Sequence, residues 1–236
     1  MDSVTVDRYN CHAADYVALY EAADMSTLHR LLLHYLPARC RILEIGCGSG
    51  RDAAFLLSHG YDVTATDASP AMLTLAAQRH PELASRLHLL SFPLSLGGER
   101  AGHALYRDEG SGTGVRVDSL TRHTAHGAPN SFPAIFSVAM VMHLTDAELR
   151  ECAVQWRDLV EDEGVLVISA STGRPGLVQL REDTGRLYCE RTPDELLKVF
   201  EQAGFTCITT HPLSDLLNRD IQWTVLILRA SPGRRG

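Results

Sequence analysis

The sequence predicts an α/β fold built on a parallel β-sheet. Two short apolar runs, RILEI (41–45) and RLHLLSF (86–92), flank the alternating segment YDVTATD (61–67), and all three have the patterning of strands. Residues 51–59 and 70–80 lie between them and have helical spacing. The order β-α-β-α-β needs crossover connections, which place the three strands parallel to one another.

Helix-start signals support these boundaries. Ser69 precedes Pro70, which suits a capping residue followed by a proline in the first helical turn. Thr145 and Glu148 have the spacing of a capping box for a helix that ends near Glu161. These signals predict where two of the crossover helices begin.

The alternation resumes in the second half of the chain. Residues 134–144 and 165–170 are apolar runs expected to form strands, and 192–204 is a helix opened by a capping pattern. Two further strands are expected at 205–211 and 221–229. Between the halves, residues 95–131 are rich in glycine and polar side chains, and we interpret them as a flexible insertion.

Composition limits the class of protein. A chain of 236 residues is long enough for one domain with a full core, and its formal net charge of −7 argues against an obligate nucleic-acid binder. The six cysteines form no C-x-x-C pair, so we expect reduced thiols and no zinc ribbon. The start MDSVTVDRYN has no signal-peptide pattern, and no apolar run approaches a bilayer span, which together predict a cytoplasmic protein without membrane segments.

The most informative motif lies at the first strand–helix turn. Glu44 ends the first strand, and Gly46, Gly48 and Gly50 form a turn that enters a helix, while Asp67 ends the second strand. Glycines let the backbone approach a ligand closely, and the helix N-terminus presents free N–H groups. An acidic residue at the end of the second strand is placed to accept hydrogen bonds from ribose hydroxyls. The ligand is therefore expected to carry a ribose.

The spacing also discriminates between ribose ligands. Arg51 stands where the dinucleotide fingerprint has its third glycine, which weakens the alternative of an NAD(P)-dependent oxidoreductase. Glu44 would repel a pyrophosphate but suits a cationic amino group. S-adenosylmethionine (SAM) carries an ammonium group, a sulfonium and a ribose, and has no phosphate.

The pattern E-x-G-x-G-x-G followed by a strand ending in Asp resembles the first two motifs of class I SAM-dependent methyltransferases. SVAMVMHL (137–144) is similar to the fourth-strand motif of small-molecule members, GVLVIS (164–169) to their fifth strand, and RTPDELLKVFEQAGF (191–205) to their late helix. The resemblance implies a Rossmann-like sheet of seven strands with an antiparallel last strand and helices on both faces. It also implies SAM as the cofactor.

The resemblance assigns roles to individual residues. It implies one domain with three parts: N-terminal lid helices in 1–38, a SAM-binding core in 39–94 and 132–230, and the insertion at 95–131. The residues that it places against SAM are Glu44, Gly46, Cys47, Gly48, Gly50, Asp67, Ala68, Met72, Ser91, Phe92 and Ala139. Ser91 departs from the family, since many members have an acid there.

The acceptor side of the site is expected from the lid and the fourth strand. The family's lid helices correspond to the segment with Tyr9, Tyr16 and Tyr20, which we expect to shape the acceptor pocket. His143 is the candidate general base, with packing at the strand end as the alternative reading. No metal-ligand pattern is present among the histidines.

Three functions follow from this reading. Methyl transfer to a small-molecule acceptor leads, because the fourth strand lacks the Asn/Asp-Pro-Pro-aromatic motif of DNA amino-methyltransferases. A protein or peptide acceptor and a non-catalytic SAM-binding protein are the alternatives. The sequence predicts no nucleic-acid partner and leaves the acceptor unidentified.

Overall fold

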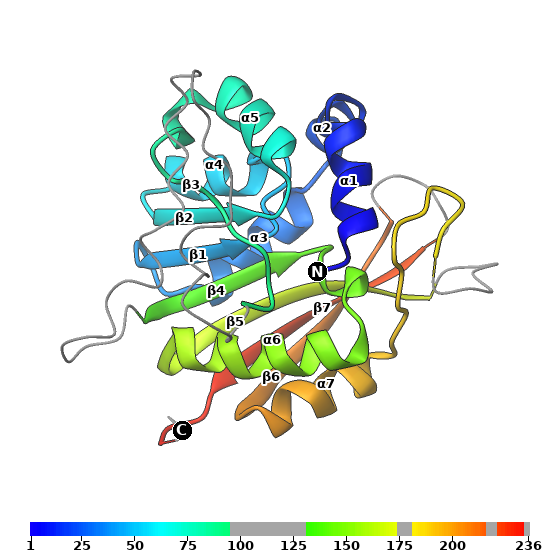
Figure 1. The fold of residues 1–236 in the computed structure, drawn as a ribbon. Helices are drawn as coiled ribbons and strands as arrows, with labels where there is room; N and C mark the ends of the chain where they lie inside the picture. Colours follow the sequence, from blue (N-terminus) through cyan, green and yellow to red (C-terminus); the bar gives the residue numbers. More distant parts are fainter. Residues whose placement is uncertain (95–130, 174–180, 216–220, 234–236) are drawn as a thin grey trace, which may run out of the picture.

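The computed structural model describes residues 1–94, 131–173, 181–215 and 221–233, and its centre is a seven-stranded sheet (Figure 1). The strands lie in the order β3-β2-β1-β4-β5-β7-β6. Strands β1 to β5 pair in parallel, and β7 is antiparallel to both β5 and β6. The predicted mostly parallel sheet with an antiparallel last strand is therefore confirmed. The strands are β1 (Arg41–Ile45), β2 (Asp62–Asp67), β3 (Leu87–Leu89), β4 (Phe132–Val138), β5 (Val160–Gly173), β6 (Phe205–Leu213) and β7 (Gln222–Ala230).

The central strands are apolar on both faces because helices cover both. Consecutive residues of a strand point to opposite faces. Ile42 accordingly belongs to one buried cluster and Leu43 to the other, and Phe136 and Ile135 divide in the same way. Such continuous apolar runs are typical of parallel strands buried on both sides.

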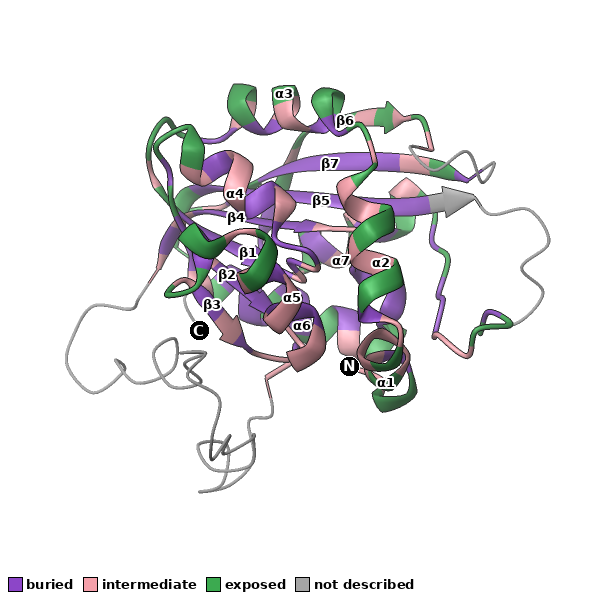
Figure 2. Cartoon of the chain, turned by 90° about the horizontal axis from the view of Figure 1, so that it is seen from above, coloured by how far each residue is buried: buried purple, intermediate pink, exposed green. Residues whose placement is uncertain are grey.

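Five helices form the two outer layers. α3 (Ser26–Tyr35), α4 (Arg51–Ser58) and α5 (Pro70–Arg79) contribute to the first buried cluster. α6 (Asp146–Leu159) and α7 (Pro193–Gln202) contribute to the second, and they lie in front of the sheet in Figure 1. Seen from above, buried strands run between helices whose outer sides are exposed (Figure 2). None of the helices in the described ranges has the length and apolar character that a membrane span requires.

The strand order reverses between β1 and β4. From β1 the chain runs outward through β2 and β3 and then returns to pair β4 with the other side of β1. Connections that leave two adjacent parallel strands in opposite directions open a crevice at the carboxyl ends of those strands, which is where open α/β sheets bind ligands. The turn after β1 and the end of β4 therefore face a common space.

The strand expected at 134–144 is shorter than predicted. β4 ends at Val138, and a 3-10 turn, η2 (Val141–His143), follows it. Ala139 has a positive φ of 54°, a left-handed conformation that cannot continue a strand, and its N–H donates to Ser169 O at 3.0 Å. The apolar pattern continues through the turn because these side chains are buried as well, so periodicity alone gave no boundary.

Several other helix and strand boundaries also differ from those expected from the sequence. The N-terminal segment expected to form lid helices contains α2 (Ala13–Glu21) and α3, which residues 22–25 separate. An additional helix, α1 (Ser3–Cys11), precedes them; it buries only Thr5, so it has no apolar stripe to signal it. β3 is shorter than the predicted 86–92, and β5 is longer than 165–170 and begins directly after α6. A further 3-10 turn, η1 (Pro81–Leu83), follows α5. The insertion predicted at 95–131 lies outside the described residues apart from residue 131.

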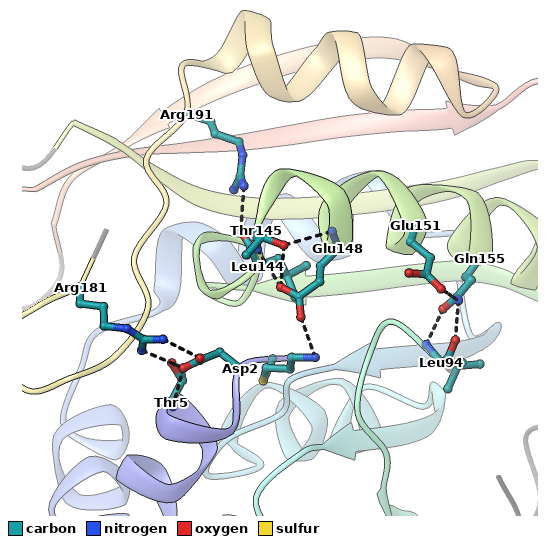
Figure 3. Close-up of polar contacts among 11 residues, drawn as sticks. Asp2, Thr5, Leu94, Leu144, Thr145, Glu148, Glu151, Gln155, Arg181 and Arg191 are labelled. Carbon is teal, nitrogen blue, oxygen red and sulfur yellow. Dashed lines mark hydrogen bonds and ion pairs between the residues drawn. The ribbon is translucent and has the colours of Figure 1, made fainter. Parts of the chain in front are cut away.

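The predicted helix starts are confirmed at atomic detail. Ser69 Oγ accepts from Met72 N at 3.1 Å and caps α5. Thr145 and Glu148 form the reciprocal capping box of α6, with Thr145 N donating to Glu148 Oε2 at 2.9 Å (Figure 3). These caps satisfy N–H groups that a helix start leaves without intrahelical partners.

We predict that Trp156→Ala lowers the free energy of unfolding by about 3–5 kcal/mol, because it leaves a large cavity between α6 and the sheet. Trp156 is 0% exposed and its ring stacks on Phe200. Val154 on the same helix is 54% exposed, so Val154→Ala is the matched control, with an expected change below about 0.5 kcal/mol. Chemical denaturation monitored by circular dichroism measures both. Equal stabilities of the two variants would contradict the packing described.

Candidate active site

Three glycines in the left-handed region form the turn between β1 and α4. The φ angles of Gly46, Gly48 and Gly50 are 79°, 55° and 81°. A Cβ on Gly46 would lie 3.0 Å from Met140 Cγ, and one on Gly50 would lie 3.0 Å from Leu83 Cδ1. Larger residues at Gly46 and Gly50 would therefore meet both backbone strain and crowding.

The turn is tied to the end of β2. The N–H groups of Gly46 and Cys47 both donate to Thr66 O at 2.8 Å. Gly48 N donates to Asp67 Oδ2 at 2.9 Å. The glycine turn and the β2 carboxylate therefore form one unit at the carboxyl edge of the sheet.

Asp67 uses both of its oxygens within the protein. Besides the bond from Gly48, Oδ1 accepts from Ser69 N at 2.8 Å. Burial raises the pKa of the Asp67 carboxyl, against the opposing effect of the hydrogen bonds from Ser69, Gly48 and Ala68. Each carboxylate oxygen can accept two hydrogen bonds, so Asp67 retains capacity for at least one further donor.

Glu44 is a buried carboxyl with an unsatisfied oxygen. Its side chain is 2% exposed, and Oε2 makes no hydrogen bond to any described residue. Burial raises the pKa of Glu44 well above its usual range, and the carboxylates of Asp52 and Asp67 raise it further, while Arg51 opposes them. A buried acceptor without a partner is costly, and the cost is relieved when a cation binds beside it.

Glu44 and Asp67 both line a cavity above the carboxyl ends of β1, β2 and β4. Twelve of the residues predicted from the sequence line it: Glu44, Gly46, Cys47, Gly48, Asp67, Ala68, Met72, Phe92, Ala139, Tyr9, Tyr20 and His143. The remaining lining residues are Met1, Val6, Ile45, Ser49, Arg51, Asp52, Ser69, Leu90, Val138 and Met140. Gly50, Ser91 and Tyr16 are the predicted residues that do not line it. We call this space the first cavity.

Helix α1 is held over the first cavity by polar contacts with the loop that precedes α7 (Figure 3). Arg181 donates to the Asp2 carboxylate at 2.7 and 3.0 Å, and Asp2 also caps the helix by accepting from Thr5 N at 2.9 Å. Thr5 Oγ1 in turn accepts from Leu187 N at 2.8 Å. The ion pair with Arg181 holds the pKa of the Asp2 carboxyl well below its usual range. On the other side, Ser69 Oγ donates to Asn10 Oδ1 at 2.6 Å.

Three tyrosines of α1 and α2, namely Tyr9, Tyr16 and Tyr20, lie in contact with one another. The ring centroids of Tyr9 and Tyr16 are 4.8 Å apart, and those of Tyr16 and Tyr20 are 5.9 Å apart. The Arg186 guanidinium lies over the rings of Tyr9 and Tyr16, at 5.5 and 5.2 Å from their centroids. Stacking on Arg186 attaches the lid to the loop before α7 through cation–π contacts.

A second cavity adjoins the first. The two share a wall, formed by Tyr9, Tyr20, Arg51, Val138, Ala139 and His143. Beyond this shared wall, the second cavity is lined by Ala23, Met25, Leu28, Met142, Ser169, Arg186, Tyr188, Leu213, Ser214, Asp215 and Trp223. A molecule in each cavity would therefore meet its neighbour at the end of β4.

His143 lies in the shared wall and has a defined tautomer. Its Nδ1 is 2.7 Å from Leu187 O and its Nε2 is 3.0 Å from Tyr9 Oη. A carbonyl oxygen only accepts hydrogen bonds, so Nδ1 carries the proton and Nε2 of the neutral ring accepts from Tyr9. The imidazole is thus held with its basic nitrogen toward Tyr9.

Sequence reasoning missed Arg186 and the loop around it. Arg186 Nη1 donates to Tyr9 Oη at 3.0 Å, and Arg186 Nε pairs with Glu182 Oε2 at 2.7 Å. The loop has neither helical nor strand periodicity, and only its spatial approach to α1 gives it a place in the site. Arg51, which follows the glycine turn directly, was not among the predicted site residues either; it donates to Tyr20 O and pairs with Asp52 at 2.9 Å.

Comparison with known proteins places this geometry in a family. Residues 43–166, more than half of the chain, match the methyltransferase domain family. A protein of Eikenella corrodens named hemagglutinin 1 is 40% identical over 65 residues, which are 27% of this chain. The matched segment covers only 21% of that protein's length.

Two solved structures share the fold along nearly the whole chain. The 1,6-didemethyltoxoflavin-N1-methyltransferase of Burkholderia thailandensis has a TM-score of 0.68 at 20% identity, over 97% of this chain and 88% of that one. The magnesium protoporphyrin IX methyltransferase of Synechocystis PCC 6803 has a TM-score of 0.68 at 16% identity, over 97% and 99%. Both were crystallised with S-adenosylhomocysteine. With the family match over residues 43–166, this chain belongs to the SAM-dependent methyltransferases.

Proposed function

We propose that this chain transfers a methyl group from SAM to a small-molecule acceptor, with SAM in the first cavity and the acceptor in the second. The observation that carries the proposal is the shared wall, where Ala139 and His143 at the end of β4 face both cavities. Bound SAM supplies an electrophilic methyl group on a cationic sulfur. The protein's part is to align the two molecules and to exclude water.

The residues of the first cavity fit SAM by charge and shape. The unpartnered Glu44 carboxyl suits the ammonium group of the methionine part, and its desolvation is compensated when that cation binds. Gly48 leaves room beside the ring of Tyr20, since a Cβ there would lie 3.6 Å from Tyr20 Cδ2. Asp67 would accept the ribose hydroxyls with its remaining lone pairs. In this arrangement Ala68, Met72 and Phe92 surround the adenine, and Cys47 contributes backbone.

A small acceptor is favoured over a peptide because the second cavity lies under the lid. Its walls come from α1, α2, α3, the end of β4, the loop before α7 and the ends of β6 and β7. Tyr9 and Tyr20 from the lid would contact the acceptor directly, with Tyr16 supporting their rings. His143 is the proposed proton acceptor.

Product formation tests the proposal. Protein incubated with SAM and a panel of neutral, anionic and cationic aromatic acceptors should produce S-adenosylhomocysteine with at least one of them, measured by mass spectrometry. Tight SAM binding without product from any acceptor would favour a non-catalytic SAM-binding protein instead. Binding of NADH in place of SAM in parallel calorimetry would overturn both.

We predict that Asp67→Ala weakens SAM binding by about ten-fold or more, because it removes hydrogen bonds to a charged acceptor that are worth about 1.5–3 kcal/mol. Asp62→Ala is the matched control, since Asp62 lies at the other end of β2 and pairs with Arg86 at the surface. Isothermal titration calorimetry measures both affinities. An unchanged affinity in Asp67→Ala would show that the ribose lies elsewhere.

We predict opposite effects of Glu44→Gln on stability and on binding. The folded pKa of Glu44 is raised, so the ligand-free native state loses stability, relative to the unfolded state, as pH rises above the unfolded value of about 4.3. The uncharged glutamine side chain of the variant has no such loss. The stability of Glu44→Gln relative to wild type should therefore increase between about pH 5 and pH 8, while SAM affinity falls.

Denaturant unfolding of the ligand-free protein across this pH range checks the first effect, and calorimetry checks the second. A stability difference that is constant with pH would contradict the raised pKa. An unchanged SAM affinity would contradict the role of Glu44 in holding the ammonium group.

A further inference from the structure

The walls of the second cavity are largely apolar or aromatic, and each of the two arginines that line it pairs with a carboxylate. Arg51 is paired with Asp52, and Arg186 with Glu182 at 2.7 Å. Asp215 is not part of the shared wall, and it accepts from Trp223 Nε1 at 3.2 Å. The other lining side chains are largely apolar or aromatic. An anionic acceptor would lose its hydration and meet only arginines whose charge a carboxylate already compensates, so the cavity favours an uncharged molecule.

Two hydrogen-bonded tyrosines connect this cavity to a candidate base, His143. Tyr20 Oη donates to Tyr9 Oη at 3.4 Å, and Tyr9 Oη donates to His143 Nε2 at 3.0 Å. Tyr9 is the donor in the bond to His143 because His143 Nδ1 carries the ring proton, which it donates to Leu187 O, so Nε2 can only accept. Tyr9 Oη also accepts from Arg186, so its two lone pairs and its proton are all engaged.

Tyr20 is the end of this chain that remains available. Its hydroxyl proton is used toward Tyr9, and within the described residues nothing donates to Tyr20 Oη, which leaves two acceptor positions. Tyr20 lines both cavities, so a donor on the acceptor molecule can reach it where the cavities meet. The methyl-accepting molecule that suits this arrangement therefore carries a hydrogen-bond donor, whose proton can pass to Tyr20 Oη.

The structure points to a specific substrate class, and this inference rests on the proposed function. We propose that the acceptor is an uncharged, apolar molecule with a phenol-like hydroxyl, whose proton leaves through Tyr20 and Tyr9 to His143. The hydroxyl oxygen forms the new bond to the methyl carbon, and the electron pair of the broken carbon–sulfur bond stays on sulfur. The hydroxyl proton passes to Tyr20 Oη, the Tyr20 proton to Tyr9 Oη, and the Tyr9 proton to His143 Nε2.

Proton affinities favour a phenol over an aliphatic alcohol. A phenol releases its proton far more readily than an aliphatic alcohol, so it is the better donor to a relay that ends on a neutral imidazole. Burial raises the pKa of Tyr9 and of Tyr20, and the charge of Arg186 opposes the shift in both cases. Both hydroxyls therefore stay protonated, and each transfers a proton to its neighbour without becoming a stable phenolate. The positive charge that leaves sulfur reappears on the imidazole, so the net charge of the site is unchanged.

Binding tests the substrate class without turnover. Protein saturated with S-adenosylhomocysteine is titrated with 2-naphthol, 2-naphthoate and 2-naphthylmethylamine, and Trp223 fluorescence reports occupancy because this residue lines the cavity. The variant Trp223→Phe serves to assign the signal, since Trp156 is buried on the other face of the sheet. We expect 2-naphthol to bind about ten-fold or more tightly than either charged analogue. Tighter binding of a charged analogue would overturn the proposal.

Two chemical probes test the relay. In mildly alkaline buffer 2-naphthol keeps its proton, whereas 4-nitrophenol is ionised and needs no base. Tyr9→Phe and His143→Gln should lower the single-turnover methylation rate of 2-naphthol by about 10²-fold or more. Methylation of 4-nitrophenolate, supplied at a concentration that offsets the weaker binding expected of an anion, should change much less in the same variants. Tyr35→Phe is the matched control, because Tyr35 Oη makes an equivalent 3.0 Å bond to His211 Nε2 outside both cavities.

Each outcome has a defined meaning. Equal losses with both probes would show that Tyr9 and His143 have only a structural role and would overturn the relay. If SAM binds and another acceptor class is methylated while 2-naphthol neither binds nor reacts, the substrate class is wrong and the proposed function stands. Failure to bind SAM would remove the proposed function itself. If His143→Gln does not fold, Tyr9→Phe, which keeps the aromatic ring, decides the question.

Discussion

The reversal of strand order between β1 and β4 is the constraint on which the rest of the site depends. It leaves the glycine turn, the end of β2 and the end of β4 facing one space. The hydrogen bond from Gly48 N to Asp67 then fixes the turn against β2. The lid and the loop before α7 close the same space from above through Asp2, Thr5 and Arg181.

The buried carboxyls at this edge of the sheet lower the stability of the ligand-free protein, and in the proposed function they bind SAM. Glu44 and Asp67 both have raised pKa values because of burial, and Glu44 leaves one oxygen without a partner in the described structure. Such groups destabilise the ligand-free protein, and in the proposed function they would gain partners when SAM binds. Functional sites commonly hold groups that local stability alone would not select.

The sequence predicted the parts of the site that depend on local rules. Glu44, Gly46, Gly48 and Asp67 follow from strand ends and a glycine turn, and the caps at Ser69 and Thr145 follow from side-chain chemistry. Elements without periodicity were not predictable, such as α1 with its weak apolar face. Ala139 was expected beside SAM, but its left-handed conformation, which ends β4, has no sequence signal. Arg186 enters the site only through tertiary contacts with Tyr9 and Tyr16.

A crystal structure of the protein with S-adenosylhomocysteine tests the central claim most directly. The account predicts the ammonium group within about 3 Å of the Glu44 carboxylate and the ribose hydroxyls on Asp67. It also predicts the sulfur at the shared wall beside Ala139, open toward the second cavity. A nucleoside bound in another place, or with its ribose away from Asp67, would contradict it.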